Sequence, residues 1–201
     1  MWMEESNYYS GFDSTQEKGF LDKLKDHIVD FIQSFVVIGA IFAIIYWQIA
    51  QPHKVSGSSM VSTFHNNDLI LTDKVSYKLS NPQYGDIIVF KNPRNKTQDF
   101  IKRVIAVEGD SVSLIDNKLY VNNQPLTENY LDLGIITSGG NFLKERETIT
   151  IGQDHFFVVG DNRPHSSDSR EWGTISRDEI IGKVFLRYWP LTDFKLIKHL
   201  P

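Results

Sequence analysis

Residues 31–50 read FIQSFVVIGAIFAIIYWQIA, a run of 20 residues without a charged side chain. A helix rises about 1.5 Å per residue, so this run is long enough to cross the roughly 30 Å of hydrocarbon in a bilayer. A helix is also the form in which a single span pairs all of its backbone groups in lipid. The run is long for a buried core helix, and its acidic leader argues against a cleaved signal peptide. It therefore predicts one N-terminal transmembrane helix.

The 30 residues before this run are polar and hold seven acidic residues and three lysines, whereas the rest of the chain holds 18 acidic and 18 basic residues. Residues 1–17 favour a disordered tail, and the apolar spacing in residues 18–30 predicts an amphipathic lead-in. Three lysines precede the span, and only Lys54 closely follows it. Positive-inside counting then predicts a single-pass protein of the cell membrane, with a cytoplasmic N-terminus and residues 51–201 outside the cell.

Residues 51–201 change to short apolar runs bounded by Gly, Asn and Pro, which is typical of β-strands. Two such runs, 111–115 and 118–122, flank Asp116-Asn117, which predicts a hairpin turn within a hairpin-rich region over residues 111–155. Residues 127–147 carry the weakest pattern, and Gly139-Gly140 is expected to be a flexible tip. No long helical period appears after residue 51. The predicted fold is mostly β, with an antiparallel-sheet domain following the single transmembrane helix.

The composition excludes several kinds of chemistry. The chain has no cysteine, so disulfides and thiolate catalysis are excluded. Its charge gives no basic footprint for nucleic acid, and its histidines have no metal-ligand spacing. We therefore expect no cofactor, no metal and no nucleic-acid partner.

A segment rich in small residues, Ser56–Phe64, begins shortly after the apolar run and contains Ser59. A serine hydroxyl becomes a nucleophile when a nearby base accepts its proton. His53 and His65 lie close in sequence, but neither has the surroundings of a catalytic triad. A serine in such a segment is more often structural, so Ser59 needs a partner from elsewhere in the chain.

Lys102 lies inside the apolar run Phe100–Ile105. Strand alternation places Lys102 on the face of Phe100 and Val104, and Arg103 on the opposite face. Burial of a lysine lowers its pKa and favours the neutral amine that a general base requires. The alternative is an edge lysine whose ammonium reaches water along an apolar stem.

The third segment, Gly160–Arg170, places two acids and two arginines around three serines within eleven residues. Arginine and carboxylate side chains pair through two parallel hydrogen bonds, so this loop is able to fix its own shape. Such a loop would hold a serine hydroxyl against a neutral lysine. A solvated turn of charged residues is the alternative.

In this order, the three segments resemble the motifs of bacterial type I signal peptidases, a family of Ser-Lys proteases. Residues 59–64 align with the family's Ser-Met-x-Pro-Thr-Leu, and residues 102–110 with its Lys-Arg-x-x-Gly-x-x-Gly-Asp. Residues 160–170 match Gly-Asp-Asn-Arg-x-x-Ser-x-Asp-Ser-Arg in full. The resemblance covers about residues 20 to 190, and its third motif is highly specific.

The resemblance implies a role for each aligned residue. Ser59 would be the nucleophile and Lys102 the general base. Some members carry a hydroxyl two residues before the nucleophile, where this chain has Gly57, so the oxyanion would rely on backbone N–H groups, with that of Ser59 as the obvious donor. Supporting roles fall on Ser166, which would orient the lysine, on the ion pair of Arg103 and Asp161, and on Asp168 and Arg170, which would shape the site. Substrate contacts are implied for Val55, Gly57, Met60, Phe64, Phe100 and Ile101.

Two positions depart from the family pattern. Ser62 stands where the family has proline, and Ala106 stands where it has glycine. Proline would fix φ after the nucleophile, and alanine is costly wherever the backbone needs a positive φ. Neither change removes a catalytic atom, so we expect lower or altered activity rather than none.

The implied function is a membrane-anchored serine endopeptidase, a signal peptidase I, that removes signal peptides from exported preproteins at small-x-small sites. An extended substrate would add as a strand along residues 55–58 and 98–101. Two alternatives remain. Self-cleaving SOS-response repressors share the Ser-Lys chemistry but are soluble, and an inactive paralogue would bind preproteins without cutting them.

Overall fold

The computed structural model describes residues 19–132 and 134–198, and the chain divides into two compact units, residues 1–43 and 44–201. The predicted tail at residues 1–17 lies outside the described residues. Helix α1 (Phe20–Gln48) contains a stretch, Lys23–Tyr46, that is long and apolar enough to cross a membrane by length and composition.

The helix boundaries differ from the prediction. The expected lead-in and span are one continuous helix, because no proline interrupts the sequence between residues 20 and 48. The helix also ends before the predicted Ala50, which is instead the first residue of strand β1 (Ala50–Lys54). Pro52 lacks a backbone N–H and cannot continue a helix, but it is tolerated in an edge strand.

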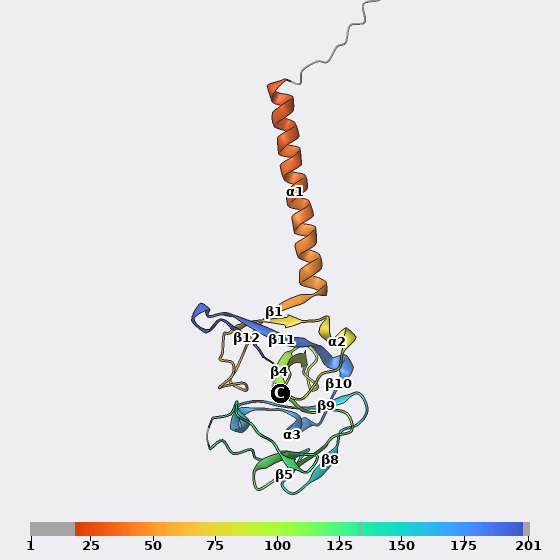
Figure 1. The fold of residues 1–201 in the computed structure, drawn as a ribbon, viewed down its shortest axis with the longest axis vertical. Helices are drawn as coiled ribbons and strands as arrows, with labels where there is room; N and C mark the ends of the chain where they lie inside the picture. The colour runs from red at the N-terminus through yellow and green to blue at the C-terminus, as the bar shows by residue number, and fades with distance from the viewer. Residues whose placement is uncertain (1–18, 133, 199–201) are drawn as a thin grey trace, which may run out of the picture. The chain divides into compact units, whose positions relative to one another are not determined.

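The second unit is built on a large antiparallel sheet in which the strands follow the order β1-β2-β11-β3-β4-β9-β10, with β12 paired to β11 (Figure 1). Its further strands are β2 (Leu69–Asp73), β3 (Ile87–Lys91), β4 (Asp99–Ala106), β9 (His155–Val159), β10 (Ile175–Ser176), β11 (Ile180–Trp189) and β12 (Lys195–Leu196). Two short helices, α2 (Ser76–Leu79) and α3 (Ser169–Trp172), connect them. The prediction of a mostly β, antiparallel fold is confirmed.

Strand β3 lies in the centre of this sheet and is buried on both faces. Ile87 and Val89 pack into one apolar cluster, whereas Ile88 and Phe90 pack into another. A strand that is covered on both sides reads as a continuous apolar run rather than as an alternation, which is the pattern of residues 87–90. The neighbouring β4 is therefore held in the interior of the sheet, where its polar residues become buried.

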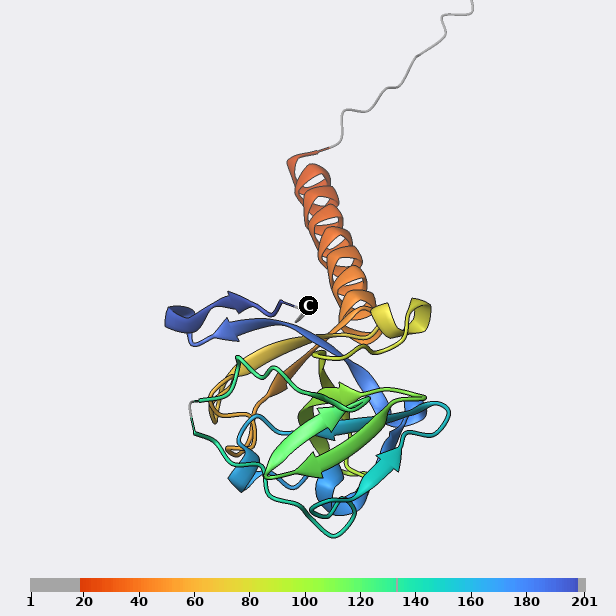
Figure 2. The same ribbon diagram turned by 60° about the horizontal axis from the view of Figure 1, so that its bottom comes forward.

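A second, four-stranded sheet has the order β7-β6-β5-β8 and comes forward in Figure 2. It contains β5 (Ser111–Ile115), β6 (Lys118–Val121), β7 (Gln124–Pro125) and β8 (Thr148–Thr150). The predicted hairpin is confirmed, because Asp116 and Asn117 form its turn with positive φ angles of 50° and 61°. This conformation suits Asn and Asp in two-residue hairpin turns.

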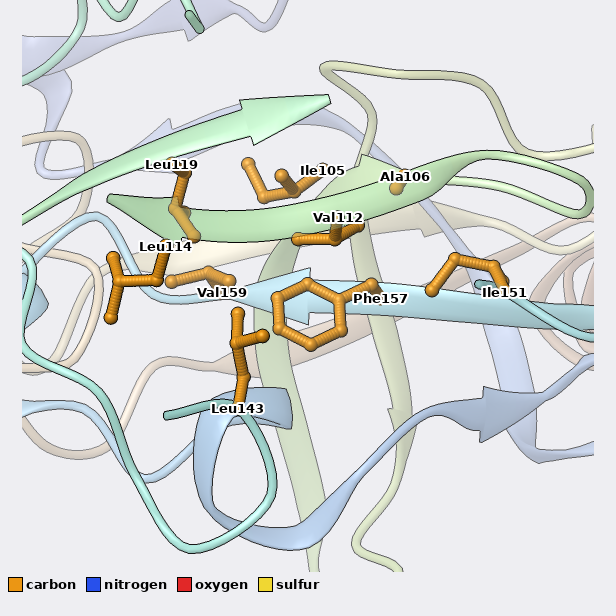
Figure 3. Packing of buried hydrophobic residues seen from close by; sticks show 9 residues of the cluster. All are labelled: Ile105, Ala106, Val112, Leu114, Leu119, Leu143, Ile151, Phe157 and Val159. Atoms are coloured by element: carbon orange, nitrogen blue, oxygen red, sulfur yellow. The ribbon is translucent and has the colours of Figure 1, made fainter. Parts of the chain in front are cut away.

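An apolar cluster joins the two sheets. Figure 3 shows side chains of β5 and β6 facing Phe157 and Val159 of β9, with Ile105 and Ala106 of β4 beside them. Leu143, from the loop before β8, packs into the same cluster. Because the C-terminal end of β4 is clamped in this way, the residues just before it are held in a fixed frame.

Candidate active site

A groove of about 310 Å³ has two sides. One side is formed by the end of β1 and the segment that follows it, and the other by the first half of β4. Its lining includes Ser59 and Lys102. Strand β4 pairs with β3 from Asp99 to Arg103, but with β9 only from Arg103 onward. Within the described part of the chain, residues 99–102 of β4 therefore have one edge without a partner strand, and this edge faces the groove.

Ser59 and Lys102 meet in this groove. Lys102 Nζ lies 2.8 Å from Ser59 Oγ and donates a further hydrogen bond of 2.9 Å to the carbonyl oxygen of Ile101. The Lys102 side chain is only 3% exposed, and its Nζ lies 5.0 Å from the centre of the Phe100 ring. The structure thus excludes the alternative of an edge lysine that reaches water.

Burial lowers the pKa of Lys102 from 10.5 to about 8. The cause is desolvation, since removing the ammonium from water favours the neutral amine. The carboxylates of Asp168 and Asp161 limit this fall, and the Arg170 guanidinium adds to it. An appreciable fraction of the lysine is therefore neutral near neutral pH, in contact with a serine hydroxyl.

The opposite face of β4 carries Arg103, which forms a bidentate ion pair with Asp161. Arg103 Nε and Nη2 donate to the two carboxylate oxygens at 2.9 and 2.7 Å. The Thr63 hydroxyl donates to the same carboxylate, and Arg103 also donates to the Gly85 carbonyl at 3.1 Å. The ion pair implied by the resemblance is present, and with the Thr63 hydrogen bond it ties β4 to both loops of the site, residues 56–64 and 160–170.

The loop after β9 is fixed by a second ion pair. Asp168 is the N-cap residue of helix α3, and its carboxylate accepts from Arg170 Nε and Nη2, both at 2.8 Å. Arg170 also donates to the carbonyl oxygens of Arg163 and Ser138, at 2.8 and 2.9 Å. These contacts agree with a shape-fixing role for Asp168 and Arg170.

Ser166 differs from the expected arrangement. Its Oγ is buried and has no hydrogen-bond partner among the described residues, so no bond to Lys102 is formed. A Cβ added to Gly160 would overlap this hydroxyl and would lie 2.5 Å from the Ser59 carbonyl oxygen. Ser166 therefore lies close to the nucleophile's backbone, while its role in orienting Lys102 stays a prediction.

The weakly patterned segment 127–147 contributes a set of supporting residues that were not predicted from the sequence. Arg163 is buried and donates to both carboxylate oxygens of Glu128, to the Tyr130 hydroxyl at 3.3 Å and to the Thr137 hydroxyl at 3.0 Å. The Tyr130 ring lies under the Arg103 guanidinium at 4.0 Å. The only sequence signal was an unassigned arginine inside the 160–170 motif.

Gly139-Gly140, which the sequence predicts to be a flexible tip, packs closely against another part of the chain, and its flexibility stays a prediction. A Cβ at Gly140 would overlap the carbonyl group of Arg170, and the Gly140 N–H donates to the Leu143 carbonyl at 2.9 Å. Glycine is needed here because another part of the backbone approaches closely.

Four of the six expected substrate-contact residues line the groove, namely Val55, Gly57, Phe100 and Ile101. Met60 and Phe64 do not line it. They are 1% and 0% exposed and pack in the core with Ile70, Ile87 and Val184. The groove also includes Asp99, which lies in the predicted substrate edge 98–101, and His53, His165 and Ser167, for which no substrate contact was predicted.

Both departures from the family motif fit the structure locally. Ser62 Oγ donates to the Tyr130 carbonyl at 3.1 Å. Ala106 is fully buried in the cluster between the sheets and is not among the residues with positive φ. The methyl group at Ala106 therefore causes no backbone strain. Among the described residues, no group of three or more His, Cys, Asp or Glu side chains is arranged to hold a metal ion.

Comparisons with known proteins show which proteins this chain is similar to. A family model described as "Signal peptidase, peptidase S26" matches residues 28–189. Signal peptidase IB of Staphylococcus aureus (strain COL) is 33% identical over 183 residues, which cover 86% of this chain and 95% of that protein. A probable signal peptidase I-2 of Synechocystis sp. is 35% identical over 155 residues, or 74% of this chain and 67% of that protein.

Among solved structures, a signal peptidase I from Enterococcus faecalis V583 matches with a TM-score of 0.43 and 31% identity, covering 52% of this chain and 97% of that one. The sequence matches define a serine endopeptidase, a class of hydrolase. More narrowly, the chain belongs to the signal peptidase family.

Proposed function

We propose that this protein is a membrane-anchored signal peptidase that removes N-terminal signal peptides from exported preproteins through a Ser-Lys dyad. The observation that carries the proposal is the 2.8 Å contact between Ser59 Oγ and a buried Lys102 whose pKa is lowered to about 8. A base must lie within hydrogen-bond reach of the proton that it removes, and its pKa must lie near the working pH. Lys102 meets both conditions.

The reaction is acyl transfer in two stages. Neutral Lys102 takes the Ser59 hydroxyl proton while Oγ attacks the scissile carbonyl carbon. The resulting lysine ammonium then gives a proton to the leaving amine, which departs with the mature protein. In the second stage Lys102 activates a water molecule, which attacks the acyl carbon and releases the signal peptide and the Ser59 hydroxyl. The Ser59 backbone N–H is our candidate donor to the oxyanion of both tetrahedral intermediates.

The groove supports a substrate in extended form. Its two sides are the unpaired edge of residues 99–102 and the segment 53–59, which correspond closely to the edges expected for strand addition. Val55, Phe100 and Ile101 supply apolar lining near Ser59. We propose that this lining favours small side chains on the substrate, as at small-x-small sites.

The location of the reaction follows from helix α1. We propose that α1 anchors the chain in the lipid of the cell membrane, with the N-terminus in the cytoplasm and residues 51–201 outside. Its apolar stretch supports the anchor, and the three lysines at positions 18, 23 and 25 support the orientation. Ser59 follows the end of α1 by eleven residues, so cleavage would take place near the membrane surface.

The test is cleavage of a preprotein with an Ala-x-Ala site by the full chain in detergent micelles. We expect the wild type to cut at that site, and Ser59→Ala and Lys102→Ala to fall to background. The exposed residues Ser80 and Lys118 give matched controls, Ser80→Ala and Lys118→Ala, which should cut like the wild type.

Two outcomes contradict the proposal. Cleavage by Ser59→Ala at the wild-type rate would show that Ser59 is not the nucleophile. A folded wild type that binds the preprotein but leaves it uncut would favour the alternative of an inactive paralogue. No observation in the described part of the structure supports that alternative.

A further inference from the structure

Asn162 contacts the backbone on both sides of the nucleophile. Its side-chain Nδ2 donates to the Ser58 carbonyl oxygen at 3.0 Å, and its backbone N–H donates to the Ser59 carbonyl oxygen at 3.0 Å. One residue thus holds both peptide groups that flank Ser59. The mechanism above gives Asn162 no role.

The first of these bonds sets the direction of a particular N–H group. The Ser58 carbonyl and the Ser59 N–H belong to the same peptide group, which is not among the cis peptides of the described chain. In a trans peptide the C=O and N–H bonds point in opposite directions. When Asn162 holds the carbonyl, the Ser59 N–H is therefore held pointing away from Asn162.

That N–H group is available. Among the residues that the structure describes, the Ser59 backbone N–H donates to no protein acceptor, although the neighbouring Val61 N–H donates to Ser58 at 3.2 Å. Ser59 is only partly buried, and it lines the groove. The group is thus an unpaired donor at the position of the attacking hydroxyl.

Asn162 is itself held in place. The preceding Asp161 is held by its bidentate ion pair with Arg103, and Gly160 packs against the Ser59 carbonyl. The Asn162 carbonyl accepts from the His165 N–H at 3.0 Å. The Asn162 side chain therefore extends from a part of the backbone that is held in place by these contacts.

We propose that Asn162 is a positioning residue whose side-chain amide aims the Ser59 N–H at the oxyanion of the tetrahedral intermediates. The inference rests on the proposed function, since it needs Ser59 to be the nucleophile. Asn162 does not touch the reacting atoms. It lowers the energy of the transition state by preventing the Ser58–Ser59 peptide group from rotating out of alignment.

Two substitutions separate this role from simple space filling. Asn162→Ala removes the Nδ2 donor but keeps the backbone bond to Ser59. Asn162→Asp keeps the side-chain shape but places a carboxylate oxygen against the Ser58 carbonyl, where two acceptors repel. Activity should therefore fall in the order wild type, Ala, Asp, whereas space filling would leave the Asp variant more active than the Ala variant.

Loss of a whole oxyanion donor costs about 100- to 1,000-fold in kcat, so a misaligned donor should cost somewhat less. For preprotein cleavage by the full chain in micelles we expect kcat of Asn162→Ala to fall about 10- to 100-fold, with KM changed less than about threefold. The pH at which kcat/KM is half-maximal should not change, because Lys102 is untouched.

The second measurement is the inhibition constant of a peptide aldehyde that carries the cleavage-site sequence. Ser59 Oγ adds to the aldehyde carbon, the hydroxyl proton passes to Lys102, and the aldehyde oxygen becomes an oxyanion. Its affinity should fall by about the same factor as kcat, since both depend on oxyanion binding. Asn141→Ala, which removes an exposed amide that donates to Glu171, is the matched control and should match the wild type.

Each result decides the matter. Parallel losses in kcat and aldehyde affinity, in the order Ala then Asp, support the inference. An unchanged kcat, a rise in KM alone, or an Asp variant more active than the Ala variant overturns it while leaving the proposed function intact. A wild type that does not cleave, or a Ser59→Ala variant that does, overturns both.

Discussion

Lys102 and Arg103 are neighbours on β4, and each is 3% exposed. Their side chains lie on opposite faces of the strand, and in the described part of the chain only one of the two has a carboxylate partner. Arg103 forms a bidentate ion pair with the Asp161 carboxylate. Lys102 has no carboxylate within ion-pair distance among the described residues, and its neighbours are the Ser59 hydroxyl and the Ile101 carbonyl. Burial without a carboxylate at ion-pair distance lowers the pKa of Lys102. One face of β4 therefore carries a structural ion pair, and the other carries the lysine that we propose as the base.

The same division extends through the site. Arg163 pairs with Glu128 and Arg170 pairs with Asp168, so each of the three buried arginines has its own carboxylate. A guanidinium stays charged in proteins, so it must be paired when it is buried. Lysine can instead lose its proton. Paired arginines therefore form the frame of the site, and a lysine that is able to lose its proton stands where we propose the base.

The sharpest test of this contrast is to replace each cation by methionine and compare the free energies of unfolding. Arg103→Met leaves the Asp161 carboxylate buried without its main partner, which should cost about 3 to 5 kcal/mol. Lys102→Met removes a buried amine that has no counter-ion, so stability at pH 7 should stay unchanged or rise by up to about 3 kcal/mol. Denaturant titration of both full-length variants in detergent micelles gives the comparison.

Asp161→Leu in the Arg103→Met background supplies the control. Removing both partners should recover part of the loss, because no buried charge is then left unpaired. Equal destabilisation by the two methionine variants would mean that Lys102 has an ion pair in solution, and the contrast between the two faces would be wrong.

The pH dependence of cleavage tests the reactive face alone. The proposed base Lys102 can accept a proton only when neutral, so the proposal predicts that kcat/KM rises with pH and levels off above the pKa of about 8. Between pH 7 and pH 9 the rise should be about tenfold. Initial rates on the preprotein across this range provide the measurement, and a rate that is flat or falls toward pH 9 would contradict a neutral-lysine base.

Stability should change with pH in the same direction. The pKa of Lys102 is lower in the folded chain than its ordinary 10.5, so the unfolded chain binds more protons between about pH 8 and 10.5. Stability therefore rises through this window. Below about pH 8 the lysine is protonated in both states, and the full cost of burying its charge remains. The Lys102→Met variant should lose this rise.

The sequence was informative where chemistry and strand pattern coincide. Strands around residues 87–91, 99–106 and 155–159 follow from their apolar runs, and the Arg103–Asp161 pair followed from motifs that placed both residues. Short edge strands such as β10 and β12 were missed because two residues carry no period. Helix α1 begins well before the predicted span, because hydropathy reports the apolar stretch and not the helix that extends beyond it.

The segment 127–147 shows why the rest of the site was not predictable. Glu128, Tyr130 and Thr137 support Arg163 through contacts that span 26 to 35 residues, and they lie in a segment without regular structure. Such contacts depend on where the folded chain returns, which local patterns do not encode. Met60 and Phe64 are buried in the core although they lie close to Ser59 in sequence, so their contact with substrate stays a prediction.

Ser62 offers the smallest test of the contrast, because it joins the nucleophile's segment to the supporting one through a single neutral hydrogen bond. Ser62→Ala removes the bond from Ser62 Oγ to the Tyr130 carbonyl and should lower the free energy of unfolding by about 1 kcal/mol. No atom at Lys102 or at the Ser59 hydroxyl is changed, so kcat/KM should stay within about threefold of the wild type. Denaturant titration and initial rates on one preparation measure both. If the arginine-based frame and the Ser59–Lys102 pair are separable, the free energy of unfolding will fall while kcat/KM stays unchanged. A fall in kcat/KM of more than about threefold would instead show that the position of Tyr130 affects Ser59.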